Sequence, residues 1–164
     1  MPAYTAGPYP LAYRGWGDVC VLLFYGVIPV CLTYYVQAGT VTATTAWISV
    51  ALGLLSVNIL LVNNVRDQEQ DAAAGKRTTV VRFGRPFGTT LYLVCAVLAV
   101  ACSWPAYFYR GAYTWLLFLI FLAFELVTWH DLRRLSGSDL NRVLGLTARN
   151  IWIYTLLLVS LLAF

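Results

Sequence analysis

Charged residues are scarce in this sequence: they make up 11% of its 164 residues, whereas 60% of the residues are hydrophobic. A soluble domain carries about 25% charged residues. A chain this apolar would expose large hydrophobic surfaces to water, so the composition excludes an ordinary soluble protein and indicates one that a lipid bilayer solvates. Aromatic residues reach 15%, a share that suits interfacial belts and ring-lined cavities in membranes.

The sequence also lacks the cysteine spacings of a disulfide framework or a zinc site. Its four cysteines are Cys20, Cys31, Cys95 and Cys102, and no two of them form a CxxC pair. Each lies in or beside an apolar run, where cysteine behaves as a small buried hydrophobic residue. Residues 1–17 contain Pro, Gly and Tyr but no apolar core, so we expect no cleavable signal peptide there.

A long basic face is missing as well, although the formal net charge is +4. The basic residues gather in two short segments between apolar runs, where membrane topology accounts for most of them. Because nucleic-acid binding needs a continuous basic surface, we expect no nucleic-acid partner.

Five apolar runs are long enough for transmembrane helices, which need about 20 residues each. They cover residues 19–36, 44–62, 88–106, 113–129 and 151–164, and the last helix is expected to begin near Leu144. Pro29 falls inside the first run, where neighbouring helices can satisfy the carbonyl that it frees. The sequence therefore predicts an all-α, polytopic transmembrane bundle of about five helices that forms one domain over residues 1–164.

The basic residues also predict the orientation. Five follow the second run and four follow the fourth: Arg66, Lys76, Arg77, Arg82 and Arg85, then Arg133, Arg134, Arg142 and Arg149. Arg14 precedes the first run, and Arg110 lies on the opposite side. By the positive-inside rule, we expect the N-terminus and both charged loops to be cytoplasmic, in a multi-pass protein of the plasma membrane.

The chemically specific segment follows the second run directly. Asn63, Asp67 and Asp71 recur every four residues. On a helix that continues past the membrane surface they would share one face, with successive members about 6 Å apart along the axis. Two carboxylates so placed can bind one or two Mg²⁺ ions, because Mg²⁺ takes few carboxylates and completes its shell with water and substrate phosphates.

A basic pair follows these acids at once. Gly75 is expected to end the helix, which places Lys76 and Arg77 beside the carboxylates as a site for phosphate. The alternative is a solvated loop whose charges only set the topology. Asp67, Glu69 and Asp71 are three of seven acidic residues, however, and acidic residues contribute little to topology. The residues therefore favour a metal-bridged diphosphate.

The stretch that carries these residues, NNVRDQEQDAAAGKRTTVVRFG at 63–84, resembles the second Asp-rich motif of the UbiA superfamily of intramembrane prenyltransferases. It is most similar to the branch that prenylates 1,4-dihydroxy-2-naphthoate in menaquinone biosynthesis. That branch has a pattern close to N-N-x-R-D-x-x-x-D-x-x-A-G-K-x-T, then a basic residue and Gly, which Arg82 and Gly84 match. Residues 4–18, 33–40 and 140–148 fit the same branch.

The resemblance implies roles for the matching residues. Asp67 and Asp71 would bind Mg²⁺ together with the diphosphate, and Asn63 would line the same face. Lys76 and Arg77 would contact phosphate, while Arg66 would pair with the acids or with the substrate carboxylate. Tyr13 and Arg14, with Asp18, lie where the aromatic substrate would enter, although an interfacial loop anchor is an equal alternative for them.

The chemistry implied is ionisation of an allylic diphosphate, followed by attack of an electron-rich ring on the allylic cation. Aromatic walls would stabilise that cation, and in the naphthoate branch the ring carboxylate leaves as CO2. Family members have about nine helices and two Asp-rich motifs, so this chain is expected to match helices five to nine. It would then work as a C-terminal half with a separate N-terminal half, as a homo-oligomer, or as part of a longer enzyme.

Two alternative functions stay open. One is a prenyltransferase with another aromatic acceptor, such as 4-hydroxybenzoate or a chlorophyll precursor, and the other is a non-catalytic membrane protein that binds isoprenoids or partners. Glu125 is a further candidate because acids inside a membrane are functional by default, although it could also snorkel to the cytoplasmic surface. We expect His130 and Asp131 to form an interface cap, and Asn58 to be exposed if the bundle is open.

Overall fold

The structure, a computed structural model, describes residues 15–110 and 114–163, and the regular elements of this part are all helices. The first long rod combines α2 (Gly17–Leu22), the π-helix η2 (Leu23–Val27) and α3 (Ile28–Ala38). The long helices after it are α4 (Ala43–Arg66), α7 (Arg85–Cys102), α9 (Thr114–Arg134) and α10 (Leu140–Ala163). Short helices join them: α5 (Gln68–Ala73), α6 (Thr79–Phe83), α8 (Trp104–Arg110) and the 3-10 turn η3 (Gly137–Asp139).

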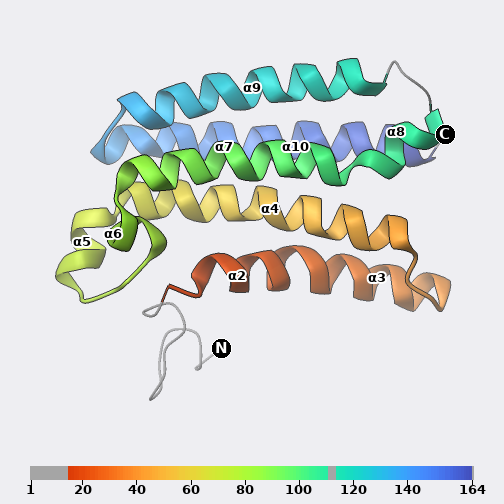
Figure 1. Cartoon of the computed structure of the whole chain (residues 1–164), viewed down its shortest axis with the longest axis horizontal. Coiled ribbons are helices and arrows are strands. Elements are labelled where there is room, and N and C mark those ends of the chain that lie inside the picture. The colour runs from red at the N-terminus through yellow and green to blue at the C-terminus, as the bar shows by residue number, and fades with distance from the viewer. Residues whose placement is uncertain (1–14, 111–113, 164) are drawn as a thin grey trace.

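Five helical segments of this part are long and apolar enough to cross a membrane, which confirms the all-α polytopic prediction. They are Gly17–Ala38, Ala43–Arg66, Arg85–Ala106, Thr114–Arg134 and Gly137–Leu162. Several helices extend beyond the predicted apolar runs, because polar residues at the ends of a run can continue the same helical hydrogen bonding. The long helices run side by side along one axis (Figure 1).

Helix α4 lies between the first rod and the other long helices (Figure 1) and packs extensively against both the rod and α7. Two apolar clusters fill the interior. One includes Leu61, Val65 and Leu132, and the other includes Phe121 and Tyr154, whose rings are 5.1 Å apart. The clusters occupy successive levels of the same four long helices, α4, α7, α9 and α10, which therefore form the core that positions the loops.

The first rod approaches α4 at a pair of glycines. A Cβ atom added at Gly26 would lie 2.2 Å from the Cα of Gly53, so only glycine permits this approach of the two backbones. Pro29 follows closely in the rod, and a proline cannot donate a hydrogen bond to the carbonyl four residues before it. The π-helix η2 ends two residues before Pro29, and a wider turn of this kind is one way in which a helix accommodates such a break.

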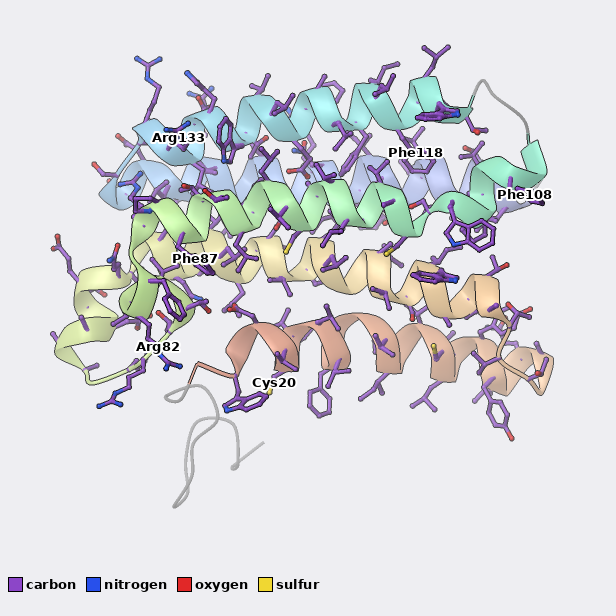
Figure 2. The ribbon with its side chains drawn as sticks, viewed as in Figure 1. Cys20, Arg82, Phe87, Phe108, Phe118 and Arg133 are labelled. Atoms are coloured by element: carbon purple, nitrogen blue, oxygen red, sulfur yellow. The ribbon has the colours of Figure 1, made fainter. Side chains whose placement is uncertain are left out.

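The two basic loops lie at the same end of the bundle. Arg85, at the start of α7, donates a hydrogen bond of 2.8 Å to the carbonyl of Leu132 and another to that of Leu135. Figure 2 shows Arg82 and Arg133 at the end where α5 and α6 lie, whereas Phe108 of α8 is at the opposite end. The loops are thus together, as expected, and their cytoplasmic location stays a prediction.

Candidate functional site

The acidic segment continues α4 with a local break. Helix α4 ends at Arg66 and α5 begins at Gln68, and Asp67 between them has φ −98° and ψ 12°. The Asp67 amide nevertheless bonds the Asn63 carbonyl at 2.8 Å, and the Asp71 amide bonds the Asp67 carbonyl at 2.8 Å. The i to i−4 hydrogen bonds therefore pass through the break, which makes the helix nearly continuous from α4 into α5, as the spacing of the acids predicts.

Gly75 ends α5, as predicted. Its φ is +73°, a left-handed conformation that costs other L-residues roughly 1–2 kcal/mol. The Gly75 amide bonds the carbonyl of Ala72 at 3.1 Å, and the Lys76 amide bonds that of Asp71 at 2.9 Å. This pair of hydrogen bonds is the Schellman motif, which turns the chain back along its own helix.

The turn places Lys76 against Asp71. The Lys76 Nζ atom lies 2.6 Å from Asp71 Oδ1, and only 10% of the Asp71 side chain is exposed. A hydrophobic contact usually joins these two positions of a Schellman motif. Here an ion pair takes its place, so a carboxylate and an ammonium meet at the start of the loop.

Arg66 holds the other carboxylate in a two-pronged contact. Its Nε is 2.7 Å from Asp67 Oδ1 and its Nη2 is 2.8 Å from Oδ2, and its Nη1 donates to Asn141 Oδ1 of α10 at 2.8 Å. The hydrogen bond from Arg66 lowers the pKa of Asp67, and the nearby charge of Lys76 lowers it further. The ammonium that pairs with Asp71 is thus also within electrostatic reach of Asp67.

The loop after Lys76 is fixed to the bundle. The Thr78 side chain caps α6 by accepting a bond of 3.2 Å from the Val81 amide, and the Thr79 hydroxyl donates to the Asp18 carboxylate of α2. Val80 is fully buried, and its methyl group would lie 2.6 Å from a Cβ added at Gly88 of α7. Asp18, which the sequence places near a substrate entry, therefore lies beside this loop.

The donor set suits a shared Mg²⁺ rather than one that the protein encloses alone. In the parts of the chain that are described, no three His, Cys, Asp or Glu side chains gather as a metal-binding group. Asp67 and Asp71 offer carboxylate oxygens, and Mg²⁺ commonly takes one or two carboxylates with substrate phosphates and water. Asn63 is half-buried and Arg77 is exposed, so neither is closed off from a ligand at this end of the bundle.

The remaining predicted residues have different outcomes. Tyr13 and Arg14 lie outside the described residues. Asn58 and Glu125 are fully buried. The exposure expected of Asn58 in an open bundle is therefore not seen, and of the two alternatives for Glu125 the structure excludes snorkelling to the surface. His130 Nδ1 lies 4.0 Å from Asp131 Oδ1, and the role of this pair as an interface cap stays a prediction.

Asn141 is the residue that sequence reasoning missed. Its contact with Arg66 joins α10 to the acidic segment, and the signal was its place in the matching stretch 140–148. An asparagine at the start of a helix is ordinary by itself, so the pattern alone does not reveal the contact.

Known proteins resemble this chain over most of its length. Residues 2–156 match the UbiA prenyltransferase family. The chain is 37% identical over 127 residues to 1,4-dihydroxy-2-naphthoate octaprenyltransferase of Haemophilus influenzae, covering 77% of this chain and 41% of that protein. It is 31% identical to the protein of the same name from Bacillus subtilis, over 73% of this chain and 38% of the relative. No solved structure matches it.

A third relative bears a different name. The 2-carboxy-1,4-naphthoquinone phytyltransferase of Synechocystis is 28% identical, over 71% of this chain and 41% of the relative. The chain spans about two fifths of the length of these curated relatives. The family match covers nearly all of the sequence, including the acidic segment and its basic turn, and the chain therefore belongs to the UbiA prenyltransferase family.

Proposed function

We propose that this chain takes part in transferring a polyprenyl group from an allylic diphosphate to 1,4-dihydroxy-2-naphthoate, a step of menaquinone biosynthesis. The observation that carries the proposal is the corner where α4, α5 and the turn after Gly75 bring two carboxylates and two cations together. A diphosphate and a divalent cation together need both kinds of charge. The names of the Haemophilus and Bacillus relatives support the naphthoate acceptor.

Asp67 and Asp71 would hold Mg²⁺ in this proposal. Members of the family generally depend on a divalent metal. When bound, the metal neutralises the charge that develops on the leaving diphosphate. Because Arg66 favours the ionised form of Asp67, that carboxylate is ready to accept a cation without first losing a proton.

Lys76 and Arg77 would bind the phosphates. In the structure Lys76 neutralises Asp71, and a metal at Asp71 would take over that task and leave the flexible ammonium able to turn toward a phosphate oxygen. Arg66 is held more firmly, by Asp67 on one side and Asn141 on the other. Its role is to orient Asp67 or to meet the carboxylate of the acceptor. Asn63 would line the same face as the two carboxylates, and Tyr13 and Arg14 would line the approach of the acceptor.

The rest of the site is proposed to come from outside this chain. Since the chain spans about two fifths of its relatives' length, we propose that a separate or preceding N-terminal half, or a second copy, completes the cage around the phosphates. The protein would lie in the plasma membrane, with α5, α6 and the loop before α10 on the cytoplasmic side, where the diphosphate head group and the naphthoate face water.

An assay of prenyl transfer tests the proposal. The purified chain is incubated with Mg²⁺, a polyprenyl diphosphate and dihydroxynaphthoate, with and without the N-terminal half of a relative. We expect little turnover from the lone chain and turnover when the half is supplied, because half of a charge cage stabilises the leaving group poorly. Transfer to 4-hydroxybenzoate instead would support another acceptor, and no transfer in any mixture would support a non-catalytic protein that binds isoprenoids.

A further inference from the structure

A group of buried polar side chains lies inside the bundle, away from the acidic corner. It consists of Tyr92 of α7, Glu125 and Thr128 of α9, and Thr147 and Asn150 of α10, each with an exposed fraction of 0%; we call it the polar layer. Tyr92 is seven residues from the start of α7, or about 10 Å along a helix that rises 1.5 Å per residue. The proposed function uses none of these side chains.

Glu125 is the exceptional member of the polar layer. Neither carboxyl oxygen has a hydrogen-bond partner among the described residues. The Tyr92 hydroxyl and the Asn150 amide are close enough to interact with it electrostatically, from α7 and α10 respectively. A buried carboxylate without partners is among the most costly arrangements in a protein, so the available donors decide which form of Glu125 fits.

The hydroxyl hydrogens of the polar layer are already committed. Thr147 donates to the Val143 carbonyl at 2.9 Å, so in its 3.1 Å contact with Tyr92 the tyrosine must be the donor. Thr128 donates to the Phe124 carbonyl at 2.9 Å. These hydroxyls can therefore act only as hydrogen-bond acceptors toward Glu125. An ionised carboxylate is also only an acceptor, so it cannot form hydrogen bonds with them.

The Asn150 amide supplies one remaining N–H group. Arg149 donates to Asn150 Oδ1 at 3.0 Å, which fixes the orientation of the amide, and Nδ2 then donates to Thr128 Oγ1 at 3.0 Å. One hydrogen of Nδ2 is left over. The amide thus turns an N–H donor toward Thr128. A metal ion bound here would need oxygen ligands, which an N–H group cannot provide, so the arrangement disfavours a metal ion.

We propose that Glu125 is an intramembrane proton-binding site: its carboxylate takes up one proton and stays a neutral carboxylic acid at neutral pH. The acid matches what the polar layer has left. Its O–H group can donate to a lone pair of a neighbouring hydroxyl, and its C=O group can accept the spare N–H of Asn150. The hydrogen bonds of the protonated side chain then link α7, α9 and α10, and no net charge is placed in the membrane interior.

The charged neighbour of Glu125 does not replace the proton. Arg149 is the cation that faces Glu125 from α10, and Tyr92 is the titratable group that faces it from α7. The guanidinium of Arg149 is exposed, bonds Asn150 and lies 5.2 Å from the Phe124 ring, and no ion pair joins it to Glu125 in the described structure. Arg149 therefore positions the amide rather than neutralising the acid.

The sequence offers a direct test, because Glu69 and Glu125 are its two glutamates. The full chain is produced with [5-13C]glutamate, and the carboxyl carbons are followed by 13C NMR and infrared spectroscopy in detergent micelles. Glu69 is exposed and serves as the ionised reference, and the Glu69→Gln variant leaves Glu125 as the single labelled carboxyl.

At pH 7 we expect one signal of an ionised carboxylate and one of a protonated acid, and the acid signal should remain alone in Glu69→Gln. The acid signal should stay unchanged when Na⁺ replaces choline as the cation of the buffer. Two ionised signals at pH 7, or an acid signal that Na⁺ converts to the ionised form, would overturn the proposal. The result does not depend on prenyl transfer, so it can fail without affecting the proposed function.

Discussion

Lys76 meets Asp71 twice: its amide bonds the Asp71 carbonyl at 2.9 Å, and its ammonium lies 2.6 Å from the Asp71 carboxylate. The backbone contact belongs to the turn that Gly75 makes, and the side-chain contact neutralises an acid that is largely buried. The geometry of this helix end thus places a basic residue beside the acidic face. This relationship connects the fold to the proposed diphosphate site.

The first prediction concerns the two carboxylates. In the complete enzyme, Asp67→Asn and Asp71→Asn should each lower the prenyl-transfer rate about 10²-fold or more, the usual cost of losing a strong electrostatic contact. Glu69→Gln is the matched control, since Glu69 lies in the same segment and is exposed. It should leave the rate within about threefold, because it removes no such contact. Equal losses in all three variants would instead indicate a general effect of negative charge.

Arg66 should set the acidic limit of activity. Its hydrogen bonds hold the pKa of Asp67 below the usual range, so Asp67 stays ionised as the pH falls until that lowered pKa is reached. In Arg66→Gln the pKa should rise toward its ordinary value, and the acidic limb of the pH–rate profile should move to higher pH. The control Arg77→Gln should lower the rate without moving that limb. An unchanged limb in Arg66→Gln would show that Asp67 does not govern it.

The glycine pair between the first rod and α4 should control stability. Gly26→Ala puts a Cβ 2.2 Å from the Gly53 Cα, and overpacking of this kind costs typically about 1–3 kcal/mol. Gly145→Ala is the control, because a Cβ there meets nothing within 4 Å and alanine favours the helix. Thermal unfolding in detergent should show a lower midpoint for Gly26→Ala alone. Equal midpoints would mean that the rod does not pack as described.

The topology can be tested with single cysteines. In a variant without the four native cysteines, Gly137→Cys and Phe108→Cys place thiols at opposite ends of the bundle. A membrane-impermeant maleimide added to intact cells should label position 108 and not position 137, because the basic loops are predicted to be cytoplasmic. Labelling of position 137 alone would reverse the orientation.

The membrane-spanning helices could be predicted because a bilayer requires long apolar segments, and these are visible in the sequence. Each of the five spans is a largely apolar segment of 21 to 26 residues, and a helix satisfies the backbone hydrogen bonds of such a segment within itself in lipid. The π-helix η2 and the break between α7 and α8 at Ser103 were not predicted. Both depend on how neighbouring helices accept a local change of hydrogen bonding, which is a property of packing and not of composition.

The candidate site was predictable along one segment and not across segments. The spacing of Asp67 and Asp71 predicted that they lie along one helical segment, and the glycine at position 75 predicted where that segment ends. Both are local effects. The contacts of Arg66 with Asn141 and of Thr79 with Asp18 join residues 75 and 61 positions apart. Full burial of Glu125 likewise follows from the way α7 and α10 cover one face of α9, which a single apolar run does not reveal.

Metal-dependent binding of a diphosphate would show whether the two carboxylates hold Mg²⁺ together with the substrate. The chain, combined with the N-terminal half, is titrated with a polyprenyl thiodiphosphate that ionises slowly, in the presence and absence of Mg²⁺. We expect the wild type and Glu69→Gln to bind tightly only with Mg²⁺, and Asp71→Asn to lose this Mg²⁺-dependent binding. Binding by Asp71→Asn that is as tight and as dependent on Mg²⁺ as that of the wild type would contradict it.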